Sequence, residues 1–324
     1  MNVLGSVAEL LAGATDIATI DSAGKSGAPL HSVRIDGRPY VVKYLDARDD
    51  WIMRAAEIDG GATLELWRRD VFDHLPACIN QPIVAVAHDG PTTALLMHDV
   101  SEWVVPATDE LIPVEQHLRF LDHMAQLHAA FWETELDIDV VSTTTRYLEL
   151  SPRTAEREAA LGSQHVVPPL IARGWNLLAE VAPAAAAIAT PLVRDPAPLV
   201  HALGDTPQTF VHGDWKLDNL GTDAQQRTIL LDWSLPGRSP ALSDLAWYLA
   251  INCRRLPRSK EDAIDAYRVA LESHGVRTDE WWSRQLRLCL LGGLVLFGWD
   301  KAFAGYDDEL AWWEQRAVEA AGLL

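Results

Sequence analysis

The sequence predicts a mixed α+β fold with a small β-rich amino-terminal lobe and a larger helical carboxy-terminal lobe. Its first hundred residues carry short strand-like apolar runs separated by turn residues, whereas most of the chain beyond them has helical periodicity. A length of 324 residues suits two domains or one large two-lobed domain. Hydrophobic residues make up 48% of the chain and charged residues 23%, as in an ordinary folded protein.

The amino-terminal lobe is expected to span residues 1–98. Three strand-like runs open it: Asp16–Ser22, Leu30–Ile35 and Tyr40–Leu45. The last two are joined through Asp36-Gly37, a pair that is typical of a tight hairpin turn. A helical stretch is expected from about Ala62 to His74. Two more strands are expected after it, at Ile83–His88 and Thr93–Met97.

The carboxy-terminal lobe, residues 99–324, is expected to be mainly helical. Pro113 opens a helix in which apolar residues recur at helical spacing, and a long helical insertion is expected at about 144–204. Three short apolar runs follow: Thr209–Val211, Asn219–Gly221 and Thr228–Leu231. Helices resume from Ser243. The most apolar run, Leu288–Trp299, is shorter than the roughly 20 residues of a membrane helix and predicts a buried helix.

The charge of the chain argues against several classes of partner. Its 27 basic and 46 acidic residues give a net charge of −19, which disfavours nucleic acid and anionic membranes. Three scattered cysteines are too few for a disulfide framework or a zinc site. No basic side chain precedes Lys25, so we expect no targeting signal and a cytoplasmic protein. The sequence leaves the oligomeric state open.

The residues that carry chemistry gather between residues 210 and 233. His212-Gly213-Asp214 ends a short apolar strand and enters a polar loop, where a rigid scaffold commonly presents reactive side chains. Eighteen residues later, Asp232 ends another apolar run, and Thr222–Arg227 reads as the hairpin loop between them. We therefore expect Asp214, Asn219 and Asp232 to meet at one edge of a small sheet.

This arrangement resembles the kinase-like small-molecule phosphotransferases, the family of the aminoglycoside phosphotransferases and choline-type kinases. Four segments carry the resemblance: Val41-Val42-Lys43, His212-Gly213-Asp214 with Asn219, Leu231-Asp232-Trp233 and Ser243-Asp244-Leu245-Ala246. It implies a two-lobed protein-kinase-like fold, ATP and Mg²⁺ as cofactors, and a catalytic loop supported by His212 and Asp244.

Phosphoryl transfer needs positioning and charge neutralisation more than covalent help from the protein. Asp214 is expected to orient the acceptor hydroxyl and accept its proton, with the Lys216 ammonium on the phosphates. Asn219 and Asp232 supply the oxygen ligands that Mg²⁺ prefers. The chain has only five lysines, yet Lys43 and Lys216 fall where a kinase would use them.

The nucleotide is expected to bind in the amino-terminal lobe. Lys43 is expected to neutralise phosphate charge and to pair with a helix glutamate, for which we choose Glu65, with Glu57 as the alternative. Gly24 and Gly27 belong to a short loop that would cover the phosphates. A P-loop is excluded there, because position 19 is Thr19 where that motif needs glycine.

The segment around Met97 and Asp99 leaves the small lobe, and the resemblance implies that its backbone faces adenine. The acceptor site is expected in the helical lobe opposite Asp214. Trp299 and Asp300 are candidates for it, because an aromatic face beside a carboxylate suits a hydroxylated or aminated ligand.

The predicted function is transfer of the γ-phosphate of ATP to a hydroxyl of a small metabolite or an aminoglycoside-like or amino-sugar-like acceptor. A protein kinase is disfavoured, because Gly213 replaces the usual arginine and no activation segment follows Asp232. Two alternatives stay open: a nucleotide-binding pseudokinase that acts as a sensor or scaffold, and a metallohydrolase built on His212, Asp214 and Asp232.

Overall fold

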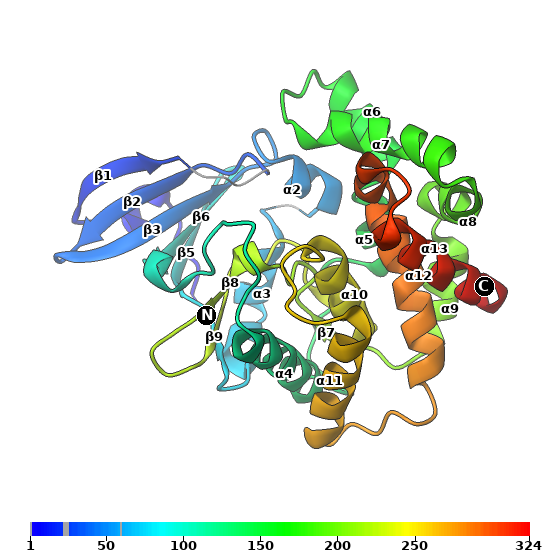
Figure 1. The fold of residues 1–324 in the computed structure, drawn as a ribbon. Helices are drawn as coiled ribbons and strands as arrows, with labels where there is room; N and C mark the ends of the chain where they lie inside the picture. Colours follow the sequence, from blue (N-terminus) through cyan, green and yellow to red (C-terminus); the bar gives the residue numbers. More distant parts are fainter. Residues whose placement is uncertain (1, 22–25, 59) are drawn as a thin grey trace.

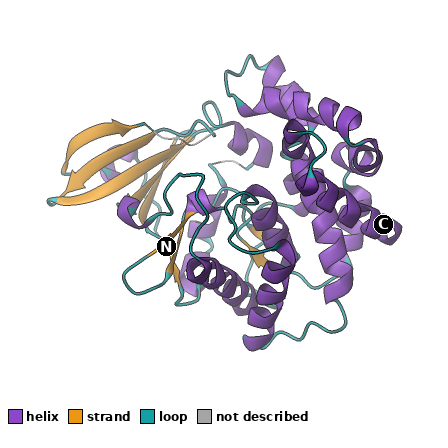
Figure 2. Cartoon of the chain, viewed as in Figure 1, coloured by secondary structure: helices purple, strands orange, loops and turns teal. Residues whose placement is uncertain are grey.

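A computed structural model describes residues 2–21, 26–58 and 60–324. The chain has a β-rich amino-terminal region and a helical carboxy-terminal part, which confirms the mixed α+β prediction (Figures 1 and 2). No helix in the described residues is long and apolar enough to cross a membrane.

The amino-terminal region is built on a five-stranded antiparallel sheet in the order β1-β2-β3-β6-β5, with the short helix α1 (Val7–Leu10) packed beside β5. Its strands are β1 (Ala14–Ile20), β2 (Leu30–Ile35), β3 (Arg38–Leu45), β5 (Ile83–Asp89) and β6 (Thr92–His98), which confirms the five predicted strands. Asp36 and Gly37 both adopt positive φ, as a tight turn between β2 and β3 requires. Strand β3 is central, so Lys43 is fixed between Leu30 and Leu95 on its two neighbours.

Two helices and a 3₁₀ turn connect the two halves of this sheet: α2 (Trp51–Ala56), α3 (Ala62–Arg68) and η1 (Val71–His74). The predicted helix from Ala62 to His74 is broken, because Asp70 adopts a left-handed conformation with φ of 53°. Helix α2 was not predicted, since six residues are too few to show helical periodicity. It begins at Asp50, whose carboxylate accepts hydrogen bonds from the Ile52 and Met53 amides.

Two small sheets lie under the amino-terminal region. One joins β4 (Ile79–Asn80), β9 (Thr228–Leu230) and β8 (Leu220–Thr222), and the other joins β7 (Thr209–Val211) to β10 (Gly237–Ser239). The strand before Asp214 and the strand before Asp232 therefore belong to different sheets. The expectation of a single sheet edge is wrong, although the loops that follow β7 and β9 do meet.

The helical part is organised around α12, which packs against α7, α8, α10 and α13. Its helices are α4 (Val114–Ala130), α5 (Thr143–Leu148), α6 (Pro152–Ala160), α7 (Val167–Val181), α8 (Pro183–Arg194), α9 (Ala197–Gly204), α10 (Leu242–Ile251), α11 (Lys260–Ser273), α12 (Trp282–Lys301) and α13 (Asp308–Ala320). Short 3₁₀ turns are η2 (Ser101–Trp103), η3 (Leu217–Asn219), η4 (Ala302–Ala304) and η5 (Ala321–Leu323). Residues 288–299 of α12 are all buried, as predicted.

The predicted insertion forms α5 to α9, and it touches the amino-terminal region through α2 and α6. Arg54 on α2 donates to both carboxylate oxygens of Glu158 on α6, at 2.8 and 2.5 Å, and the Glu158 side chain is fully enclosed. Nearby, Arg157 pairs with Glu57 at 3.1 Å, but the Glu57 side chain is 67% exposed. The buried pair is thus the stronger link between these two parts of the chain.

Arg54→Met should lower the free energy of unfolding by about 3–5 kcal/mol, because it leaves the Glu158 carboxylate buried without its partner. Arg157→Met is the matched control on the same pair of helices and should cost at most about 1 kcal/mol. Urea denaturation followed by tryptophan fluorescence measures both. Equal effects of the two substitutions would contradict a special role for the buried pair.

Candidate active site

The backbone of the loop after β7 is held in place by the Asp244 side chain. The Asp244 carboxylate accepts a hydrogen bond from the His212 amide through one oxygen and from the Gly213 amide through the other, each at 2.8 Å. Gly213 has φ of +80°, and a Cβ there would lie 2.0 Å from the Leu235 carbonyl oxygen. Only glycine therefore fits at this position, and Asp244 fixes the path of the chain into Asp214.

Asp244 is itself buried and bonded. His128 Nε2 lies 3.2 Å from its carboxylate, and His128 Nδ1 lies 2.6 Å from the Tyr267 hydroxyl. Burial raises the pKa of the Asp244 carboxyl, but hydrogen bonds and charge from His128 and His212 outweigh it and hold that pKa below its ordinary value. Burial lowers the pKa of His212 itself. The His212 ring accepts a hydrogen bond from the Asp214 amide at 3.2 Å. This ring therefore stabilises the loop and does not face solvent.

Asp214 is held by three side chains. Its Oδ2 accepts from Lys216 Nζ at 2.7 Å and from Asn219 Nδ2 at 2.8 Å, while its Oδ1 accepts from Trp247 Nε1 at 3.0 Å. Trp247 is absent from the predicted site. The signal that could have found it is its place one turn after Asp244 on α10, which puts both side chains on the same helix face.

Asp232 connects this loop to the amino-terminal sheet. Its Oδ1 accepts from Lys43 Nζ at 2.7 Å and from the Ser234 hydroxyl. Burial raises the pKa of Asp232, but the charges of Lys43 and Lys216 outweigh it and hold the pKa well below its usual range. For Lys216, burial lowers the pKa, and the charges of Asp214 and Asp232 raise it above its ordinary value. Acidic and basic groups therefore alternate along the series Lys43, Asp232, Lys216 and Asp214.

The predicted pairing of Lys43 with Glu65 is wrong. Glu65 instead contacts Arg68 at 2.9 Å and Arg69 at 3.5 Å, and the alternative, Glu57, pairs with Arg157. Lys43 pairs with Asp232 instead, and the capping residue of α2, Asp50, lies close enough to Lys43 for their charges to interact. Burial raises the pKa of Asp50, whereas the nearby charge of Lys43 lowers it.

The other predicted nucleotide residues lie along the amino-terminal region. Gly27 adopts φ of +98°, and a Cβ there would lie 2.3 Å from the His165 ring and 2.5 Å from the Asp49 carbonyl oxygen. Gly24 lies outside the described residues. Met97 pairs with Val41 across β3 and β6, and the Asp99 carboxylate accepts from the Ser101 amide at 3.0 Å.

The predicted acceptor residues lie apart from the loop of Asp214. The Trp299 backbone lies against Gly174 and its ring contacts Phe303 at 6.4 Å between centroids. Asp300 lies 3.6 Å from the Lys301 ammonium. In the described part of the chain, neither residue contacts Asp214.

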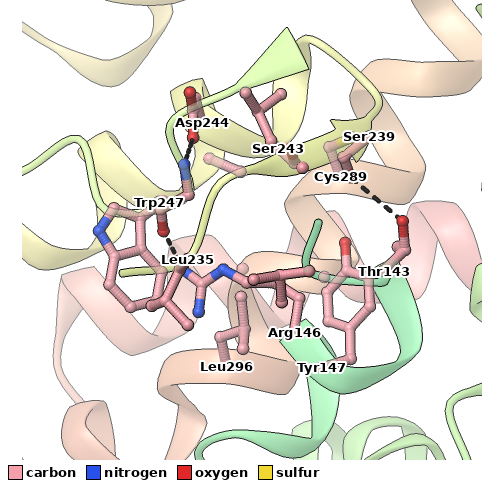
Figure 3. A pocket seen from close by; sticks show the side chains of 17 residues that line it. Thr143, Arg146, Tyr147, Leu235, Ser239, Ser243, Asp244, Trp247, Cys289 and Leu296 are labelled. Carbon is pink, nitrogen blue, oxygen red and sulfur yellow. Dashed lines mark hydrogen bonds between the residues drawn. The ribbon is translucent and has the colours of Figure 1, made fainter. Parts of the chain in front are cut away.

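Two hollows flank the loop. Behind it lies a cavity of about 20 Å³, room for about one water molecule, bordered by Arg146, Tyr147 and Trp247 (Figure 3). Beside it lies an open cleft of about 300 Å³, which we call the Lys216 cleft. Its lining residues are Ala107, Thr108, Asp109, Lys216, Asp218, Ile251, Asn252 and Arg255.

Asn219 and Asp232 each offer a side-chain oxygen that suits a magnesium ion. Asn219 Nδ2 donates to both the carbonyl and the Oδ2 of Asp214, at 3.0 and 2.8 Å, and in the part of the chain that the structure describes its Oδ1 has no hydrogen-bond donor. Among the described residues, the second carboxylate oxygen of Asp232 also has no hydrogen-bond partner. One carboxylate and one amide oxygen, completed by water and phosphate oxygens, form the donor set that Mg²⁺ takes in phosphate sites.

Comparison with known proteins identifies the family. The model of the phosphotransferase enzyme family matches residues 112–281, more than half of the chain. The chain belongs to this family. No curated protein sequence matches this phosphotransferase.

Solved structures show its fold. A thermostable mutant of aminoglycoside phosphotransferase APH(4)-Ia, in a ternary complex with ADP and hygromycin B, is 17% identical with a TM-score of 0.50, over 98% of this chain and 97% of that chain. Choline kinase LicA from Streptococcus pneumoniae is 12% identical with a TM-score of 0.52, over 98% and 96%. The predicted kinase-like fold is thereby confirmed.

Asp244→Asn should destabilise the phosphotransferase by about 1–3 kcal/mol at pH 7, because an amide can accept only one of the two backbone hydrogen bonds and turns its NH₂ toward the other donor. The folded pKa of Asp244 is depressed, so its contribution to stability is present above the ordinary value of 3.8 and is lost as the pH falls through the folded pKa.

The variant should therefore lose less stability than the wild type as the pH falls below the ordinary carboxyl value of 3.8. Urea denaturation across this pH range is the measurement. If the free energies of unfolding of the two proteins changed in parallel with pH, Asp244 would not be the group that causes the loss of stability.

Proposed function

We propose that this phosphotransferase is an ATP-dependent small-molecule kinase that transfers the γ-phosphoryl group to an acceptor hydroxyl with the help of Mg²⁺. Residues 1–98 would form the nucleotide-binding lobe and residues 99–324 the catalytic lobe. The observation that carries the proposal is the connected set of charges from Lys43 through Asp232 and Lys216 to Asp214. It joins a phosphate-binding cation, metal ligands and a base within one network.

The hydrogen bonds of Asp214 indicate where an acceptor would bind. A carboxylate offers about four acceptor positions, two on each oxygen. Lys216 and Asn219 use both positions on Oδ2, and Trp247 uses one on Oδ1. The position that remains on Oδ1 is the one to which we assign the acceptor hydroxyl. Asp214 would orient this hydroxyl and take its proton as the phosphoryl group is transferred.

The nucleotide side of the site would be formed by the amino-terminal lobe. Lys43 projects its ammonium to Asp232 and is placed to neutralise phosphate charge. Asn219 and Asp232 would hold Mg²⁺, which when bound neutralises charge on the phosphate oxygens. Gly27 and the backbone around Met97 and Asp99 complete the proposed ATP site. The APH(4)-Ia complex contains ADP, which supports this assignment.

The acceptor would be a small hydroxylated molecule. The similar structures are a phosphotransferase bound to hygromycin B and a choline kinase. In this chain the Lys216 cleft opens beside Asp214 and carries the carboxylates of Asp109 and Asp218. We therefore place the acceptor in that cleft instead of at Trp299 and Asp300. Free Cys78, Cys253 and Cys289 support a reducing, cytoplasmic environment.

The two alternative functions are less well supported. A pseudokinase would not need Lys43, Asp214, Asn219 and Asp232 together. For a metallohydrolase, His212 is fully buried and bonded to its own loop. The described residues also contain no group of three or more His, Cys, Asp or Glu side chains suited to a metal ion.

The test is a coupled ADP-release screen with ATP and Mg²⁺ over aminoglycosides, amino sugars, simple sugars and amino alcohols. Acceptor-dependent ADP release, with a phosphorylated product seen by mass spectrometry, is the expected result. ATP binding without transfer to any acceptor would favour the pseudokinase, and metal-dependent hydrolysis without ATP would favour the hydrolase.

Asp214→Asn should lower kcat by about 10²-fold or more, because the amide cannot accept the proton of the hydroxyl. The affinity for ATP should change little, since other residues hold the nucleotide. Calorimetry with ATP and acceptor-dependent ADP release measure the two quantities. Turnover within about threefold of the wild type, far from the loss that removal of a general base causes, would show that Asp214 is not the base.

Asp232→Asn should abolish productive magnesium binding, because the amide keeps the shape but loses the charge that competes with water for the ion. Asn219→Ala removes one neutral oxygen and should have a smaller effect. Titration of the rate with Mg²⁺ compares the two variants. A wild-type magnesium dependence in Asp232→Asn would place the metal elsewhere.

A further inference from the structure

Trp247 touches the atom on which the proposed chemistry depends. Its indole N–H donates to Asp214 Oδ1 at 3.0 Å, and its side chain is buried. Oδ1 is also the oxygen with one acceptor position left open. Because two partners on one carboxylate oxygen occupy different lone-pair directions, the indole N–H determines the direction from which an acceptor hydroxyl can approach.

Arg146, from helix α5 of the insertion, holds this indole in place. Its guanidinium carbon lies 3.8 Å from the centre of the Trp247 ring, and its Nη2 donates to the Gly213 carbonyl at 2.5 Å. Figure 3 shows the Arg146 side chain extended alongside Trp247. One guanidinium therefore contacts both the ring that binds Asp214 and the residue that precedes Asp214.

The charge of Arg146 is balanced within the same helix region. Its Nη1 donates to the buried Glu149 carboxylate, three residues further along the chain. The Trp247 ring also packs against Phe297 of α12, with 4.6 Å between ring centroids. Packing and charge pairing thus leave the indole little freedom to rotate away from Asp214.

From these contacts we infer that Trp247 and Arg146 are positioning residues for phosphoryl transfer. Trp247 sets the orientation of the Asp214 carboxylate, and Arg146 acts through Trp247 and the Gly213 carbonyl. The inference rests on the proposed function, since it needs Asp214 to receive the acceptor hydroxyl. Neither residue belongs to the motifs that carry the family resemblance.

Trp247→Phe is the most direct test, because it keeps a six-membered aromatic ring for Arg146 and Phe297 and removes the five-membered ring that carries the indole N–H. Loss of a hydrogen bond to a charged group should lower kcat by about 10- to 100-fold. The KM for ATP should stay at its wild-type value. The thermal midpoint should fall slightly, because the smaller ring leaves space at a buried site, so the loss of kcat is compared at a temperature where both proteins are folded.

Trp281→Phe is the matched control, since its indole N–H donates to the Arg277 carbonyl, away from the loop of Asp214. It should leave kcat unchanged. Arg146→Lys keeps a cation for Glu149 but loses the planar stacking. It should lower kcat by itself. It should lower kcat less when Trp247 is already Phe, because no indole N–H then remains to be positioned and only the contact with the Gly213 carbonyl is affected.

A wild-type kcat in Trp247→Phe would overturn the inference while leaving the kinase intact. Equal effects of Arg146→Lys in both backgrounds would overturn the role of Arg146 in positioning the indole and leave only its contact with the Gly213 carbonyl. A readout independent of turnover is the ¹⁵N–¹H resonance of the Trp247 indole, assigned through Trp247→Phe. It should shift upfield in Asp214→Asn, and an unmoved resonance would also overturn the inference. Absence of transfer by the wild type with every acceptor would instead overturn the proposed function.

Discussion

The pair of hydrogen bonds from the loop backbone to Asp244 is the constraint on which the rest of the site depends. This buried carboxylate accepts hydrogen bonds from two consecutive amides. It thereby fixes a turn that requires glycine at position 213. Helix α10 carries that carboxylate and packs on α12, so the position of Asp214 is tied to the buried helices of the carboxy-terminal part. These contacts make the loop as rigid as the core against which it is held. A polar loop of this length would not be rigid without them.

The charges of the site are arranged so that each ionised group has an opposite neighbour. Asp232 lies between the lysines of the two regions, and Asp214 receives Lys216 on one oxygen. Such alternation is what allows several buried charges to coexist, since an unpaired one would be neutralised by a shift in its pKa. It also concentrates two of five lysines at one place in a chain with a net charge of −19. A polyanionic ligand would meet two ammonium groups there, although Asp214 and Asp232 balance their charge.

The sequence was informative where the determining contacts are local. Asp36-Gly37 fixes a hairpin through backbone conformation, and His212-Gly213-Asp214 lies within a few residues of Asn219. Prediction from the sequence failed where contacts between distant parts of the chain determine which residues pair. The contact of Lys43 with Asp232 joins residues 189 apart in sequence, so no local pattern shows that Lys43 pairs with Asp232 and Glu65 with Arg68. Trp299 shows the same limit, because the pattern of an aromatic residue beside an acidic one cannot distinguish a ligand site from helix packing.

The insertion contacts both the amino-terminal region and the loop of Asp214. Through Glu158 it holds the helix that follows the Lys43 strand, and through Arg146 it holds the loop of Asp214. Replacing the insertion with that of a relative to change the acceptor would therefore also change the contacts of the catalytic loop. Sequence change in this segment is coupled to residues on both of the regions it touches, so new specificities would have to evolve, or be engineered, together with compensating changes outside it.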